Sequence, residues 1–224
     1  GLFSRLYSPS DHGKLLTLIV KETGWSIHLK SIMAGMAPDH TIFLLRHPCA
    51  IISSIKDGVS KGLMKKQDRQ EKARWYDIHR DNAFVKARKL KKNDIQDLTD
   101  LEFWAIKIRV LYDLFMEIKA SENDQVSMVI YEDIQAQTVD ELGKIFNFLW
   151  FDFGQSIYDF VNESKTMNSS SLLLPESNSE YFAVHRSGKF NPYKWKSKLS
   201  HDEITAITEI IGQTILEKFW PCDK

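Results

Sequence analysis

Three short apolar runs along the chain are each followed at once by charged or polar residues. The runs cover residues 15–20, 41–45 and 125–131, and they lead into Lys21-Glu22, Arg46-His47 and Glu132-Asp133. Continuous apolar runs of this length are typical of strands buried on both faces of a parallel sheet. We therefore expect three buried strands whose carboxyl ends share one edge of a sheet, the edge at which α/β proteins bind their ligands.

Between and after these runs, apolar residues recur at steps of three and four, which predicts amphipathic helices. The three stripes are Leu101, Trp104, Ile108, Leu111, Tyr112 and Phe115; Leu142, Ile145, Phe146 and Leu149; and Ile204, Ile207, Ile211, Ile215 and Phe219. Strands that alternate with helices predict an α/β fold, with a parallel sheet covered by helices on both faces. A length of 224 residues favours a single domain, residues 1–224.

Two polar segments interrupt this pattern. Residues 56–100 are rich in Lys, Arg, Asp and Gln, which favours a solvated helical surface over the alternative of a ligand lid. Residues 162–192 are rich in Ser and contain Pro175 and Pro192, so we expect a long loop there. Loops of that length in compact domains are often functional.

Charge and cysteine content exclude several classes of function. The chain has 30 basic and 30 acidic side chains, so it lacks the basic excess of proteins that wrap nucleic acid. No apolar run is long enough to span a bilayer, and the start does not resemble a secretion signal, so we expect a cytoplasmic protein. Cys49 and Cys222 are expected to be reduced thiols, and the His and Cys spacings predict no metal site.

The strongest chemical signal is the segment Arg46-His47-Pro48, which follows an apolar strand and opens a helix. Proline suits the first helical turn, because the N–H that it lacks has no helical partner there. The start of a helix supplies free N–H groups and a field that favours an anion, and Arg46 adds a guanidinium. Ser54 follows eight residues after Arg46. The alternative interpretation is a salt-bridged arginine and a serine that bonds its own helix.

This segment resembles the 3′-phosphate-binding segment of sulfotransferases, which use 3′-phosphoadenosine 5′-phosphosulfate as donor. The resemblance implies a P-loop NTPase-like fold and assigns Arg46 and Ser54 to the 3′-phosphate of the nucleotide. Three further segments match in the same order: Lys21 at a strand end, Val129–Ile134 (VIYEDI), and Arg186-Ser187-Gly188 ahead of Trp195-Lys196. By the same resemblance, Arg186 and Gly188 close over the nucleotide, and Glu132 and Asp133 are structural partners of a cap or loop.

The resemblance also implies the chemistry, the transfer of a sulfuryl group to a hydroxyl or amine of a small molecule or carbohydrate. Lys21 would neutralise charge at the departing oxygen. The general base stays open between Glu22, His28 and a carboxylate outside this sequence. The family's phosphate loop should lie several tens of residues before Leu15, so we expect the fold to be incomplete at its N-terminus.

Two alternatives remain at this level: a non-catalytic nucleotide- or sugar-binding module on the same fold, and a diverged P-loop kinase relative. The acceptor is not identified. Trp75, Tyr76, His79 and Trp104 could line an acceptor pocket, but their helical spacing favours core packing.

Overall fold

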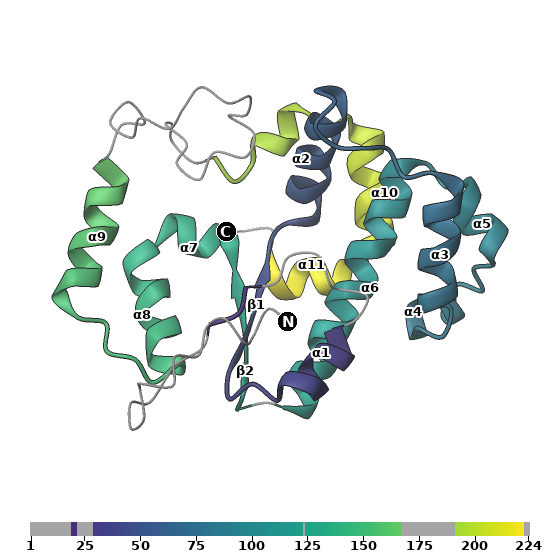
Figure 1. Ribbon diagram of the computed structural model, residues 1–224. Coiled ribbons are helices and arrows are strands. Elements are labelled where there is room, and N and C mark those ends of the chain that lie inside the picture. Colours follow the sequence, from purple (N-terminus) through teal and green to yellow (C-terminus); the bar gives the residue numbers. More distant parts are fainter. Residues whose placement is uncertain (1–18, 22–28, 123, 167–190, 222–224) are drawn as a thin grey trace.

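Two parallel strands with helices packed around them form the part of the chain that the computed structural model describes, residues 19–21, 29–122, 124–166 and 191–221 (Figure 1). Strand β1 (Thr41–Leu45) pairs with β2 (Val126–Ile130), and the register sets Thr41 opposite Val126 and Leu45 opposite Ile130. The described chain is therefore a mostly helical α/β structure with a small parallel sheet.

The strands predicted at 41–45 and 125–131 are confirmed to within one residue at either end. The prediction of a strand at 15–20 is wrong for its last two residues. Ile19 and Val20 lie in an irregular segment and are 79% and 48% exposed. An apolar run becomes a buried strand only where a neighbouring strand accepts its backbone hydrogen bonds. Residues 15–18 lie outside the described residues.

The connection from β1 to β2 is long and entirely helical in its regular elements. It contains α2 (Pro48–Ser60), α3 (Arg69–His79), α4 (Ala83–Ala87), α5 (Lys92–Asp97) and α6 (Asp100–Ser121). Helix α6 carries the predicted apolar stripe, and it begins at a capping box in which Thr99 and Glu102 each accept the other's backbone N–H. Its length lets it run beside the sheet (Figure 1).

The remaining helices flank this unit. They are α1 (Leu29–Met36) before β1, then α7 (Tyr131–Ala136), α8 (Thr138–Phe148), α9 (Gln155–Thr166), the short 3₁₀ helix η4 (Lys194–Ser197), α10 (His201–Ile211) and α11 (Gln213–Phe219). The stripe from Ile204 to Phe219, expected on one helix, is split between α10 and α11. Gly212 ends α10 with φ of 87°, a left-handed backbone that breaks the helix.

The hydrophobic core lies on one face of the sheet. Phe43, Leu45 and Val126 point to this face and join buried side chains of α2, α6, α10 and α11. The expected cover on both faces is only partly present. On the opposite face Val129 is buried, whereas Leu44, its partner in the register, is 55% exposed.

The polar segment 56–100 is helical, as predicted, but it is not only a solvated surface. Trp75, Phe84, Val85 and Ile95 are buried, and Trp75 packs edge-on against Phe103 of α6. The polar composition of the segment did not indicate this buried side, because a few apolar side chains are enough to bury one side of a short helix.

Among the helices that the structure describes, none combines the length and the apolar character needed to cross a bilayer.

Candidate functional site

The predicted anion-binding segment forms the turn between β1 and α2. β1 ends at Leu45, and α2 begins at Pro48 with His47 as its N-cap residue. This confirms the strand, the turn and the position of the proline. The turn lies at the carboxyl end of the strand, beside the first residues of α7 (Figure 1).

Side chains from two other elements fix the backbone of this turn. The hydroxyl of Tyr112, on α6, accepts the N–H of Arg46 at 3.2 Å and donates to the carbonyl of the same residue. The carboxylate of Glu132, on α7, accepts the N–H of His47 at 2.9 Å. Tyr112 is almost wholly buried, and burial raises the pKa of its hydroxyl, so it stays protonated and able to donate.

The N–H groups that we expected to be free for an anion are engaged within the protein. Cys49 donates to Nδ1 of His47 at 3.2 Å, and Ala50 and Ile51 donate to the carbonyl oxygen of His47 at 2.9 and 3.1 Å. Together with the bond from His47 to Glu132, these contacts use the amides at the start of α2. The prediction of free backbone N–H groups at this helix start is therefore wrong, because local capping satisfies the donors of the first turn.

His47 is held between aromatic rings as an uncharged imidazole. Its ring stacks on Trp195 at a centroid distance of 4.6 Å and meets Trp220 edge-on at 5.4 Å. The pKa of His47 is lowered from 6.5 to about 4, first because burial penalises the imidazolium and then because Lys196 is nearby. At neutral pH the ring is therefore an acceptor for the N–H of Cys49.

This environment predicts that the stability of the fold depends on pH. Between pH 6.5 and about pH 4 the unfolded chain is protonated at His47 while the folded chain is not, so the free energy of unfolding falls as the pH falls. Above this window the titration of His47 has no effect on stability, and below it the loss of stability reaches about 3 kcal/mol. Urea unfolding at pH 4.5 and 7 should show that His47→Asn, which keeps a capping oxygen but does not titrate, has a smaller dependence on pH. An equal dependence in both proteins would contradict the assignment.

The side chain of Arg46 remains without a hydrogen-bonded partner at one nitrogen. Its guanidinium carbon lies 5.2 Å from the centre of the Tyr131 ring, a cation–π contact. Within the described part of the chain, Nε of Arg46 is buried and has no hydrogen-bond partner. A buried donor without a partner is costly, so this nitrogen is a candidate contact for an anion.

Ser54 lies within α2, seven residues after the N-cap His47. Seven residues are close to two helical turns, so Ser54 is on the same face of α2 as the turn, about 9 Å along the axis from Pro48. Arg46 and Ser54 thus belong to the same strand-helix unit, with Arg46 directly after β1 and Ser54 within α2.

Of the other predicted site residues, the structure describes Lys21 alone. Lys21 lies in an irregular segment with its side chain exposed. Glu22, Arg186, Gly188 and the alternative base His28 lie outside the described residues.

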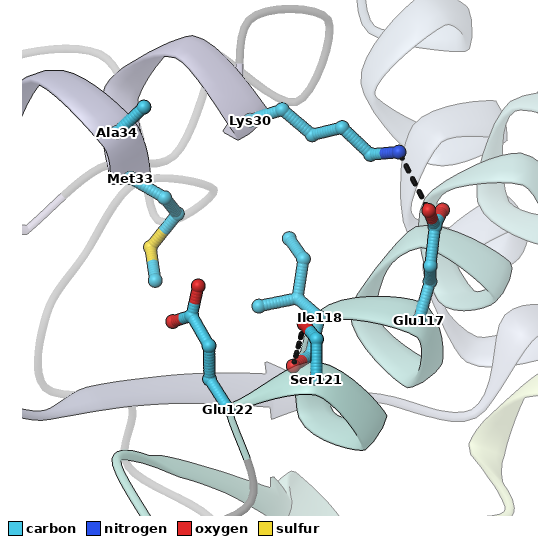
Figure 2. A pocket seen from close by; sticks show the side chains of 7 residues that line it. All are labelled: Lys30, Met33, Ala34, Glu117, Ile118, Ser121 and Glu122. Carbon is cyan, nitrogen blue, oxygen red and sulfur yellow. Dashed lines mark hydrogen bonds and ion pairs between the residues drawn. The ribbon is translucent and has the colours of Figure 1, made fainter.

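Two cavities lie away from the turn between β1 and α2. One of about 310 Å³ lies between α1 and the end of α6, where Lys30 and Glu117 form an exposed ion pair of 2.7 Å and Met33 faces Glu122 (Figure 2). The other, about 10 Å³, lies between α3 and α6 and has Trp75, His79 and Lys107 in its lining. It has room for about one water molecule. The position of Trp75 and His79 supports packing rather than an acceptor pocket.

Two further observations limit the chemistry of the described residues. Cys49 is fully buried, and burial raises the pKa of its thiol to about 12, so it is not a nucleophile at neutral pH. In residues 19–21, 29–122, 124–166 and 191–221, no three His, Cys, Asp or Glu side chains are grouped so that they could hold a metal ion.

A scan against models of protein families found no match to this chain, and neither a search of curated proteins nor a search of solved structures found one. The site must therefore be judged on its own geometry.

Sequence analysis did not identify Tyr112 as a residue of this site. It falls on the apolar stripe of α6, so it was predicted only to pack in the core.

Proposed function

We propose that the chain belongs to a sulfotransferase that binds 3′-phosphoadenosine 5′-phosphosulfate, with Arg46 and Ser54 as ligands of the 3′-phosphate. The supporting observation is the position of Arg46, at the carboxyl end of a parallel strand with its backbone fixed and a buried guanidinium nitrogen unpartnered among the described residues. Because Tyr112 fixes the backbone of Arg46, this part of the residue needs little reorganisation when a phosphate binds, and the guanidinium can supply charge-assisted hydrogen bonds.

In the proposed reaction, an acceptor oxygen or nitrogen forms a bond to sulfur while the bond from sulfur to the bridging phosphate oxygen breaks. The bridging oxygen keeps the electron pair, and the acceptor's proton passes to a base. Such transfers depend on alignment and on stabilising the departing oxygen. We assign alignment to Arg46 and Ser54, with Arg186 and Gly188 as further nucleotide ligands and Lys21 at the departing oxygen. The base remains open between Glu22, His28 and another carboxylate.

The test is calorimetry with adenosine 3′,5′-bisphosphate, the product nucleotide. Arg46→Ala should weaken binding by about 10- to 100-fold, because it removes charge-assisted hydrogen bonds to the 3′-phosphate. Arg69→Ala is the matched control, since Arg69 is an exposed arginine paired with Asp97 on the distant α3–α5 helices. It should leave binding unchanged.

Absence of binding by the unmodified protein at high micromolar nucleotide would refute the proposal, as would equal affinities of the unmodified protein and Arg46→Ala.

One observation favours a second candidate, a non-catalytic nucleotide-binding module on the same fold. The amides at the start of α2 are used internally, so this turn offers a phosphate its guanidinium but not the amides of a cradle. Binding of the nucleotide without transfer of sulfate to any acceptor would favour this module over the enzyme.

A further inference from the structure

Glu132 joins three parts of the chain that are far apart in sequence. Its carboxylate accepts the N–H of His47 at 2.9 Å, and its second oxygen accepts Nε1–H of Trp220 at 3.1 Å. Glu132 lies in the first turn of α7, His47 in the turn after β1, and Trp220 at the end of α11. One side chain thus connects the proposed phosphate site to the C-terminal helix.

The groups around this carboxylate also contact one another. The Trp220 ring stacks on Tyr112 with centroids 6.0 Å apart and meets the ring of His47 at 5.4 Å. Tyr112 in turn holds both backbone groups of Arg46. The turn is therefore fixed by Tyr112 on one side and by Glu132 on the other, with Trp220 in contact with both.

The same helix also orients the guanidinium. Tyr131, which precedes Glu132, presents its ring to the guanidinium carbon of Arg46 at 5.2 Å. Because Glu132 ties the amide after Arg46 to the first turn of α7, it fixes the distance between the backbone of Arg46 and that ring. A shift of α7 relative to the turn would move the guanidinium away from its present direction.

The carboxylate also determines which groups a phosphate can meet. It lies at the start of α2 and accepts the N–H of His47, so this amide is not available to a phosphate. A phosphate is therefore directed to the guanidinium of Arg46.

We propose that Glu132 is a positioning residue, which sets the direction of the Arg46 guanidinium and so determines how strongly the protein prefers a nucleotide with a 3′-phosphate. This inference rests on the proposed function, because it takes Arg46 as the ligand of that phosphate. Trp220 acts through the same carboxylate, so its contribution should depend on Glu132.

The test compares the dissociation constants of adenosine 3′,5′-bisphosphate and adenosine 5′-monophosphate, measured by calorimetry on the full chain. Their ratio isolates the contribution of the 3′-phosphate. Glu132→Gln keeps the shape of the side chain but can accept with only one atom and presents an NH₂ group to the other donor. It should lower the ratio by about threefold to tenfold. Trp220→Phe, which removes the indole donor and part of the ring system but keeps an aromatic side chain, should lower it by a smaller factor.

The double variant adds a second criterion. If both residues act through the same carboxylate, Trp220→Phe should change the ratio less in the Glu132→Gln background than in the unmodified protein. Glu217→Gln is the matched control, because Glu217 is an exposed glutamate on α11 whose bond to Gln213 the amide can preserve. It should leave the ratio unchanged.

The outcomes separate the two proposals. If the unmodified protein prefers the 3′-phosphorylated nucleotide and both single variants keep that preference, Glu132 is only a structural contact and the inference is overturned. If the unmodified protein shows no preference, the proposed 3′-phosphate site fails and this inference fails with it. Should Glu132→Gln not fold, Trp220→Phe decides alone, because an unchanged ratio in that variant also overturns the inference.

Discussion

Replacing Gly212 by alanine is expected to destabilise the folded chain by about 3 kcal/mol or more. The residue has φ of 87° and ψ of 139°, a conformation that residues with a Cβ atom rarely adopt. A Cβ built there would lie 2.7 Å from Nη1 of Arg109. That guanidinium cannot move freely, because it donates to the carbonyl of Ile211 and pairs with Asp113 at 2.9 Å.

Thermal and urea unfolding measure this effect, and the midpoint temperature should fall by about 6–12 °C. Gly143→Ala is the matched control, because Gly143 lies inside α8 and no atom lies within 4 Å of the position that the new methyl group would take. Its substitution should stabilise the chain by about 0.5–1 kcal/mol, since alanine favours a helix. If the two substitutions had similar effects, the break between α10 and α11 would not depend on the backbone of Gly212.

Replacing Lys72 by methionine is expected to destabilise the chain by about 2–3 kcal/mol. Lys72 is 6% exposed, a rare state for a lysine. Its ammonium donates to the carbonyl of Leu98 at 2.7 Å and lies 3.5 Å from the carboxylate of Asp100, which ties α3 to the start of α6. Methionine fills much of the space but leaves the carbonyl of Leu98 without its donor.

Lys92→Met is the control for this prediction, because Lys92 pairs with Asp77 at 2.6 Å but both side chains are close to half exposed. Exposed pairs of this kind contribute less than about 1 kcal/mol. Urea unfolding of the two variants should therefore differ clearly. Equal effects would show that burial of the ammonium does not determine its contribution.

Local patterns in the sequence were sufficient to predict the strands and helices that form the candidate site. The runs at 41–45 and 125–131 predicted the two strands, and the spacing of apolar residues predicted α6 and α8. Pro48 marked the start of α2. These succeed because strand and helix each impose a short period on side-chain direction, which is visible within a few residues.

The same patterns failed where the outcome depends on a distant partner. The run at 15–20 was apolar enough for a strand, yet Ile19 and Val20 are exposed outside the sheet. The stripe from Ile204 to Phe219 predicted one continuous helix. The structure breaks this helix at Gly212, where Arg109 of α6 donates a hydrogen bond to the carbonyl of Ile211.

For the candidate site, the sequence determined its chemistry and its place: an arginine at a strand end, a proline that opens a helix, and a serine two turns later. Only the tertiary structure decided which of these groups can meet a ligand. Glu132 and His47 accept the amides at the start of α2, and Tyr112 bonds the backbone of Arg46. Among these described groups, the guanidinium of Arg46 is therefore the one left for a ligand. The physical reason is that a buried backbone donor needs an acceptor to offset its loss of water. Here the acceptors come from residues far along the chain, such as Glu132, which lies 85 positions after His47.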